Sequence, residues 1–179
     1  MNVLSTDIEG LVVVQPPIHS DERGSFVKTY NEALFKDLGI GFRPREEFFS
    51  ISHRNVIRGM HFQLPPADHA KVVYCLTGSI LDVVLDLRTG GRTYGKWWTR
   101  ELNDVSRELV HIPLGCAHGF LSLTEGALTA YLVGSEYDVT RDTGIRWDSF
   151  GYQWPVKNPI VSSRDQTLPR LAEFVSAFN

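Results

Sequence analysis

The sequence predicts an all-β fold, an antiparallel sandwich or barrel, on the strength of three observations. Fifteen glycines and nine prolines divide the chain at short intervals, and the segments between them are rich in β-branched and aromatic residues. The segment 79–87 alternates regularly, with Leu81, Val83 and Leu85 on one face, which is the side-chain period of a β-strand. Helical patterns occur only near the two ends of the chain.

The other strands are predicted from short apolar runs bounded by turn residues. Thr77 and Gly78 precede the segment 79–87, and Gly90 and Gly91 follow it. The remaining candidates are 11–14, 25–30, 48–52, 71–76, 96–102, 108–112, 119–123 and 128–133. About eight to ten antiparallel strands form a jelly roll, and the mouth of such a barrel can hold a ligand cavity.

Short helices are predicted at the periphery of the sandwich. Asn31 can cap a helix that ends at Gly39. This helix is expected to bury Leu34, Phe35 and Leu38.

A C-terminal helix is also predicted, from the spacing of apolar residues. Leu171, Phe174, Val175 and Phe178 stand at i, i+3, i+4 and i+7, the pattern of an amphipathic helix. Pro169 is tolerated in its first turn. The residues before it, 148–168, have the composition of a long loop, and ordered loops of this length are often functional.

Size and composition predict a single globular domain over residues 1–179. Apolar residues make up 42% and charged residues 22%, which excludes a disordered chain. The net charge is -3 and no basic run occurs, so no nucleic-acid partner is expected. No membrane span or signal peptide is recognisable. Cys75 and Cys116 lie in no pairing motif and are predicted to be reduced thiols of a cytoplasmic protein.

Several polar residues in or beside the predicted strands and in the last loop can carry chemistry. They are Arg58, His61, Lys71, His118, Tyr131, Tyr137 and Asp165. Each has a structural explanation when taken singly. A strand histidine is more often simply hydrogen-bonded, a tyrosine in an apolar run belongs to the core, a lysine is solvated, and an aspartate before a helix is a cap. Only the combination of these residues indicates a function.

These residues fall within motifs that occur in the same order in a known family. The motifs are Asp21-x-Arg23-Gly24-x-Phe26, Arg58-Gly59-Met60-His61-Phe62-Gln63, Lys71, Pro113-x-Gly115-x-x-His118-Gly119-Phe120, Tyr131 with Tyr137, Trp147-x-x-Phe150 and Ser162-x-x-Asp165. Through them the chain resembles the dTDP-4-dehydrorhamnose 3,5-epimerase family, whose members are jelly-roll, cupin-like enzymes. The resemblance extends from residue 21 to residue 165, most of the chain.

The resemblance implies epimerisation at C3, C5 or both of a nucleotide-linked 4-keto-6-deoxyhexose, with no cofactor and no metal. A C–H beside a ketone is weakly acidic, so a base must act together with a group that stabilises the enolate oxygen. An acid must then return a proton to the opposite face. By resemblance, His61 is the base and Asp165 holds its second ring nitrogen. Lys71 then faces the C4 oxygen, and Tyr131 is the acid.

The resemblance also implies residues that bind the substrate, and a partner. Arg58, His118, Gln63 and Tyr137 are expected to hold it in the pocket, and members of the family are homodimers. Arg23 and Phe26 are expected to reach the nucleotide site of the neighbouring subunit. The product is expected to enter deoxysugar and surface-polysaccharide (O-antigen) biosynthesis. The centres inverted, the final sugar and the role of Tyr137 stay open.

Three positions depart from the pattern of the family at the nucleotide end. Lys28 replaces a glutamate, Glu46 a glutamine and Phe48 an asparagine. Because such changes alter hydrogen bonding to a base, we expect a nucleotide other than dTDP, with CDP as the hypothesis. Phe48 can stack on a base, and Glu46 can accept from its amino group. The alternative is that neighbouring residues have taken over recognition of dTDP.

Three other functions are weighed against epimerisation. A metal-dependent cupin needs about three histidines and a carboxylate, but His61 is followed by Phe62 and Gln63, so the usual histidine pair is broken. A metal-free ketoisomerase would move the carbonyl of the same sugars. A non-catalytic cupin would only bind them, but binding alone needs no acid–base pair.

Overall fold

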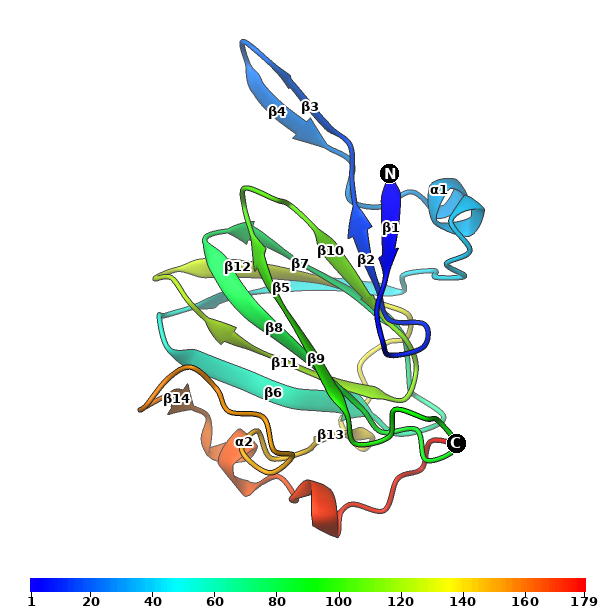
Figure 1. Ribbon diagram of the computed structural model, residues 1–179, viewed down its shortest axis with the longest axis vertical. Helices are drawn as coiled ribbons and strands as arrows, with labels where there is room; N and C mark the ends of the chain where they lie inside the picture. The colour runs from blue at the N-terminus through cyan, green and yellow to red at the C-terminus, as the bar shows by residue number, and fades with distance from the viewer.

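The computed structural model describes residues 1–179 as two packed sheets with one hairpin projecting from an end (Figure 1). The first sheet has the order β1 (Asn2–Ser5), β2 (Val12–Gln15), β10 (Leu109–Ile112), β7 (Lys71–Thr77), β12 (Ala127–Val133) and β5 (Glu46–Ser52). The second has β13 (Asp142–Gly144), β6 (Val56–Gln63), β11 (Cys116–Ser122), β8 (Ser79–Asp86) and β9 (Trp97–Asn103), with β14 (Ile160–Val161) parallel to β6. The projecting hairpin is β3 (Ile18–Asp21) and β4 (Gly24–Val27). The predicted all-β jelly-roll sandwich is confirmed.

Each of the nine predicted strand segments overlaps a strand of the structure, but five strands were not predicted. The most important of these is β6, because it carries Arg58, His61 and Gln63. Its sequence lacks a clean alternation, and Gly59 weakens the strand pattern. The missed strands β1, β3, β13 and β14 are two to four residues long, too short to give a periodic signal.

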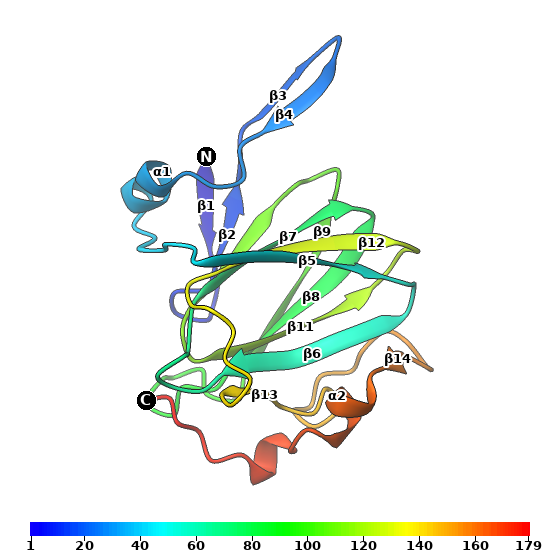
Figure 2. The ribbon, with the colours of Figure 1, turned by 180° about the vertical axis from the view of Figure 1, so that it is seen from behind.

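The alternation in β8 produces two buried faces. Ile80 and Val84 lie in the core between the sheets. Val83 and Leu85 are equally buried, but in a second core on the outer side of the second sheet. The chain after β13 covers that side with Ile145, Phe150 and Trp154 among others (Figure 2). A strand covered on both sides needs apolar residues at every position that faces a layer.

The helix α1 (Glu32–Asp37) forms as predicted on the outer side of the first sheet. The Asn31 side chain accepts a hydrogen bond from the Leu34 N–H at 3.0 Å, and Gly39 ends the helix with a φ of +78°. Phe35 is fully buried against Phe42 and the sheet. Leu34 was expected to be buried as well and is 39% exposed, since a six-residue helix turns only one narrow face to the sheet.

The predicted C-terminal helix is wrong. Only a single 3-10 turn, Leu171–Glu173, forms there, and the helix α2 (Ser163–Thr167) lies earlier, within the segment expected to be a loop. The final residues run extended. Phe174 and Phe178 turn inward, both packing on Phe62, while Val175 is 90% exposed. The inward-facing residues at even positions therefore follow the period of two of an extended chain.

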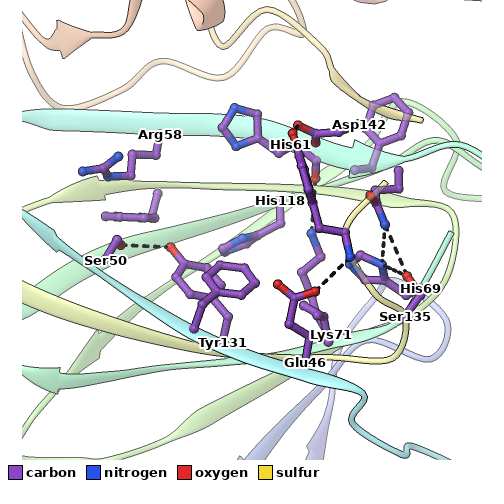
Figure 3. A pocket seen from close by; sticks show the side chains of 16 residues that line it. Glu46, Ser50, Arg58, His61, His69, Lys71, His118, Tyr131, Ser135 and Asp142 are labelled. Atoms are coloured by element: carbon purple, nitrogen blue, oxygen red, sulfur yellow. Dashed lines mark hydrogen bonds between the residues drawn. The ribbon is translucent and has the colours of Figure 1, made fainter. Parts of the chain in front are cut away.

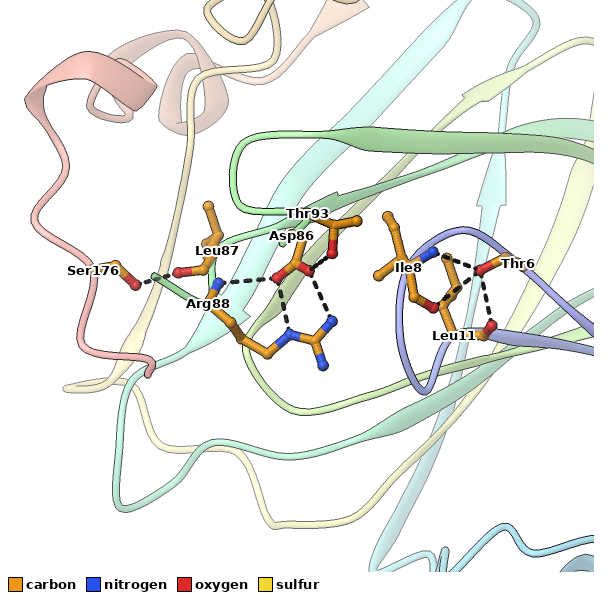
Figure 4. Close-up of polar contacts among 8 residues, drawn as sticks. All are labelled: Thr6, Ile8, Leu11, Asp86, Leu87, Arg88, Thr93 and Ser176. Atoms are coloured by element: carbon orange, nitrogen blue, oxygen red, sulfur yellow. Dashed lines mark hydrogen bonds and ion pairs between the residues drawn. The ribbon is translucent and has the colours of Figure 1, made fainter. Parts of the chain in front are cut away.

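Polar contacts fasten this extended end to the end of β8 (Figure 4). The Ser176 hydroxyl donates to the Leu87 carbonyl, and the Thr89 N–H donates to the Phe178 carbonyl at 3.0 Å. Beside them the buried Asp86 carboxylate accepts from Arg88 and Thr93. The tail thus adds a layer over the second sheet. No helix in the structure is long and apolar enough to span a membrane.

Candidate active site

A cavity of about 380 Å³ lies between the two sheets (Figure 3). It is lined by nine of the residues selected from the sequence: Glu46, Phe48, Arg58, His61, Gln63, Lys71, His118, Tyr131 and Tyr137. His61 reaches it from the second sheet, and Lys71 and Tyr131 reach it from the first. The two walls therefore present different reactive groups to the same space.

A close approach of β6 and β11 places two histidines side by side. His61 and His118 are direct partners in the antiparallel register of these strands. Gly59 has a φ of +138°, and a Cβ there would lie 2.5 Å from the Cα of Gly119. Glycine is required at such a contact because any side chain would separate the strands.

His61 is held from behind by Asp165. Its Nε2 lies 2.7 Å from Asp165 Oδ1, and the Asp165 carboxylate also accepts the Gly59 N–H at 3.2 Å. Burial acts to raise the pKa of the Asp165 carboxyl, but these hydrogen bonds outweigh it and hold the pKa below its ordinary value. Because the partner is a carboxylate, it favours the neutral tautomer in which Nε2 carries the proton and Nδ1 keeps a free lone pair.

Asp165 does not line the cavity; it is 3% exposed and lies on the other side of His61. Its position comes from the start of α2, where its N–H donates to the capping Ser162 hydroxyl at 3.0 Å. The cap and the contact to His61 therefore involve the same short element, as the predicted motif Ser162-x-x-Asp165 requires.

Lys71 places an ammonium group deep in the cavity. The side chain is 8% exposed, and Nζ donates to the His61 carbonyl at 3.4 Å. Burial lowers its pKa to about 8, although the negative charges of Asp142 and Asp82 act in the opposite direction. At neutral pH Lys71 is therefore a cation in a poorly hydrated space.

Tyr131 is held mainly by aromatic rings. Phe48 stacks on it with ring centroids 4.7 Å apart and planes 17° apart, and His118 meets it edge-on at 6.0 Å. Its hydroxyl lies 3.5 Å from the Ser50 hydroxyl. Burial raises the pKa of the phenol far above its ordinary value, so the group stays protonated and able to donate. In Figure 3, Tyr131 lies on one side of Lys71 and His69 on the other.

His118 is one half of a second, fully buried histidine–aspartate pair. Its Nε2 lies 2.6 Å from Asp82 Oδ1, while Asp82 Oδ2 has no hydrogen-bond partner. Asp82 was not selected from the sequence. Its signal was an aspartate inside an otherwise apolar strand, at a position whose neighbours Ile80 and Val84 face the core.

The cavity wall formed by the segment after β12 is fastened by Gln63. Gln63 Nε2 donates to the Ala67 carbonyl at 2.9 Å and to the Ser135 hydroxyl at 3.2 Å, and its Oε1 accepts the Asp138 N–H at 2.6 Å. His69 completes this cluster, with Nδ1 2.7 Å from Ser135 Oγ. Burial and the nearby Lys71 charge lower the pKa of His69 to about 4, so it is neutral.

More exposed charged and polar groups also line the cavity. Arg58 donates to the Ser52 hydroxyl at 3.0 Å, and Glu46 accepts the Tyr137 N–H at 2.8 Å. The Tyr137 hydroxyl donates to Asp142, whose carboxylate also pairs with Arg164 at 2.7 Å.

Seven lining residues lie beyond the predicted set, and four of them are polar: Ser50, His69, Ser135 and Asp142. No sequence motif marks these four, and their position depends on how the strands pair.

Three predicted binding residues lie outside the cavity of their own chain. Arg23 and Phe26 belong to the projecting β3–β4 hairpin, where Arg23 pairs with Asp21 and Phe26 is 61% exposed (Figure 1). Lys28 follows the hairpin and is exposed. No group of three or more His, Cys, Asp and Glu side chains is arranged to hold a metal ion.

Comparison with known proteins agrees with this architecture. A family model described as dTDP-4-dehydrorhamnose 3,5-epimerase matches residues 5–173. The chain is 37% identical to the dTDP-4-dehydrorhamnose 3,5-epimerase of Methanothermobacter thermautotrophicus, over 95% of this chain and 94% of that protein. It is 36% identical to the dTDP-4-dehydrorhamnose 3-epimerase of Streptomyces niveus, over 97% and 85%.

A solved structure extends the likeness to three dimensions. The crystal structure of dTDP-4-dehydrorhamnose 3,5-epimerase from Bacillus anthracis, with TDP and PPi bound, superposes with a TM-score of 0.93 at 31% identity. The match covers 95% of this chain and 99% of that one. The jelly-roll sandwich, the cavity between its sheets and these matches agree: the chain belongs to the dTDP-4-dehydrorhamnose 3,5-epimerase family, and it is an isomerase of the epimerase class.

Proposed function

We propose that the cavity binds a nucleotide-linked 4-keto-6-deoxyhexose and that the protein inverts C3, C5 or both. The observation that carries this proposal is the convergence of His61, Lys71 and Tyr131 on one cavity from two facing sheets. A cavity of about 380 Å³ is within the range of small-molecule sites and suits a hexose, with the nucleotide extending past Arg58 toward solvent.

The chemistry is a proton transfer in two steps. His61 Nδ1 removes the proton beside the C4 ketone, the C–H electron pair forms a C=C bond, and the carbonyl electrons move to oxygen. The Lys71 ammonium stabilises this enolate oxygen. The Tyr131 phenol then returns a proton to the opposite face of the same carbon as the carbonyl forms again, and the two groups regain their starting protonation states by exchange with water.

Other residues hold the substrate in this scheme. Arg58 pairs with the diphosphate, and His118, oriented by Asp82, donates to the sugar. Gln63 and Tyr137 shape the wall that the sugar contacts. The number of centres inverted depends on how the sugar is seated, and the related proteins include one named as a 3-epimerase and one named as a 3,5-epimerase.

The protein is proposed to act as a homodimer. On the outer face of the first sheet, Phe49, Ile51 and Leu76 are 65%, 60% and 52% exposed and lie beside one another through the pairing of β5, β12 and β7. An uncovered apolar area of this kind marks an interface. The β3–β4 hairpin would then carry Arg23 and Phe26, followed by Lys28, to the neighbouring cavity. Size-exclusion chromatography with light scattering tests this, and a monomer refutes it.

The nucleotide is proposed to be CDP, with dTDP as the alternative. Phe48 is 45% exposed and keeps one ring face free of Tyr131, so that face can stack on a base. Glu46 uses Oε2 to accept the Tyr137 N–H, and Oε1 makes no hydrogen bond within the chain, which leaves it able to accept from the cytosine amino group. The product would enter deoxysugar biosynthesis.

One experiment tests the reaction and the nucleotide together. The dTDP-, CDP- and GDP-linked 4-keto-6-deoxyglucoses are incubated in D₂O with the protein and with His61→Asn, and followed by NMR. Epimerisation places deuterium at C3 or C5 of a 4-ketosugar, and His61→Asn slows this by roughly 10²–10⁴-fold.

The other outcomes refute specific parts of the proposal. A shifted carbonyl indicates a ketoisomerase, and binding without exchange indicates a non-catalytic protein. A strong preference for dTDP refutes the nucleotide hypothesis alone.

A further inference from the structure

The orientation of the Tyr131 phenol is determined by few contacts. Its hydroxyl has a single partner in the chain, Ser50 Oγ, at 3.5 Å, which is long for an O–H···O hydrogen bond and therefore weak. A proton donor that serves one face of a sugar must point in a constant direction, because misplacement of a catalytic group by about 1 Å can cost roughly 10²-fold in rate. Something other than a hydrogen bond must hold the ring.

The contact that fits this role is the stack between Phe48 and Tyr131. The two residues are direct cross-strand partners in the β5–β12 register, and their rings lie 4.7 Å apart and nearly parallel, at 17°. Cross-strand aromatic pairs are among the stronger side-chain contacts in a sheet. Tyr131 is 8% exposed whereas Phe48 is 45% exposed, so the Phe48 ring also separates the phenol from solvent.

The position of β5 makes this contact specific. β5 is the last strand of the first sheet, with β12 as its only neighbour. Its alternate residues Phe48 and Ser50 both face Tyr131, while Phe49 is directed to the outer side of the sheet. The inner face of one edge strand therefore supplies both the stacking contact and the hydroxyl partner of the phenol.

We propose that Phe48 is a positioning residue for Tyr131, holding the phenol at the angle from which it returns a proton to the substrate. This inference rests on the proposed role of Tyr131 as the acid. It assigns Phe48 a task in the proton-return step that is separate from any contact its free ring face makes with the nucleotide.

The test separates removal of a proton from its return. Phe48→Leu and wild type are compared in D₂O with the 4-ketosugar nucleotide that wild type converts faster. Deuterium in recovered, unconverted substrate reports abstraction and return on the same side, and product formation reports inversion. We expect inversion to fall about threefold to tenfold, the range for loss of a stacked aromatic pair. Exchange into the substrate is expected to continue, so the ratio of exchange to inversion rises by the same factor.

Three variants serve as controls. Phe48→Trp keeps a stacking ring and is expected to retain the wild-type ratio. Tyr94→Leu removes an aromatic side chain of similar exposure, 41%, outside the cavity, and is expected to leave both rates unchanged. Phe48→Ile repeats the test with a β-branched residue suited to a strand, should Phe48→Leu fold poorly.

Two results overturn the inference. If Phe48→Leu raises KM with kcat and the exchange-to-inversion ratio unchanged, Phe48 contacts only the nucleotide. If exchange and inversion fall equally, its role is general support of the cavity.

A readout without substrate keeps the inference separate from the proposed function. With ¹³C-labelled tyrosine, the ring-flip rate of Tyr131, assigned through Tyr131→Phe, is expected to be higher in Phe48→Leu than in wild type. An unchanged ring-flip rate overturns the positioning role of Phe48 even if the wild-type protein proves inactive on every 4-ketosugar tested.

Discussion

Replacement of Lys71 by methionine should stabilise the fold and abolish most of the activity. Lys71 has a similar length to methionine and is 8% exposed, so the change removes a charge with little change in volume. The pKa of Lys71 falls from 10.5 to about 8 in the folded protein, which corresponds to about 3–4 kcal/mol at about 1.4 kcal/mol per pH unit. This value already includes the attraction of Asp142 and Asp82. The protonated ammonium therefore destabilises the native state by that amount.

The sign of the pH dependence follows from the direction of the pKa change. Below pH 8 the lysine is protonated in both the folded and the unfolded chain, and the full penalty applies. Between about pH 8 and 10.5 the folded protein loses the proton first, so the penalty decreases as the pH rises. Above 10.5 both states are neutral and the penalty is absent. The advantage of Lys71→Met should be complete at pH 7 and should shrink across this interval.

The assay is thermal or urea unfolding of both proteins at equal concentration, at pH 7 and at pH 10.5. At about 2–4 °C per kcal/mol for a chain of this size, Lys71→Met should melt about 6–16 °C higher at pH 7. Lys157→Met, at an exposed lysine, is the control and should change little. Turnover by Lys71→Met should fall at least about 10²-fold, because the enolate oxygen loses its cation. A variant that is less stable at pH 7, or equally favoured at both pH values, contradicts the reasoning.

Three further outcomes are expected. Tyr131→Phe should lower the rate of inversion by roughly 10²–10⁴-fold, while His61 still exchanges the substrate proton with D₂O. If the exchange rate falls together with the inversion rate, the assignment of separate acid and base residues is contradicted. Asp165→Asn should lower turnover by a similar factor, because the amide can donate to His61 Nε2 and leave Nδ1 protonated. Circular dichroism checks that the variant is folded, and wild-type turnover would show that the His61–Asp165 pair is not essential. Phe35→Ala should lower the free energy of unfolding by about 3–5 kcal/mol with turnover per folded molecule unchanged, since Phe35 packs from α1 onto the first sheet, away from the cavity. A stability loss under 1 kcal/mol would show that the site collapses or is hydrated.

Short sequence patterns were enough to predict the elements whose structure depends on residues close in sequence. The alternation of 79–87 predicted β8, and Asn31 with Gly39 predicted both ends of α1. The tail shows the limit of such signals. Phe174 and Phe178 satisfy a helical and an extended period equally, and the surface offered by Phe62 on the second sheet favoured the extended form.

The amino-acid sequence alone therefore determined the fold class and the types of group available for proton transfer, because strand periodicity and the motifs can be recognised in short stretches of sequence. Only the tertiary structure decided which groups meet. The register of β6 against β11 sets His61 beside His118, and the start of α2 brings Asp165 behind His61 across 104 positions of sequence. The pairing of β5 with β12 lays Phe48 on Tyr131. Such contacts depend on strand register and sheet packing, which no short stretch of sequence encodes.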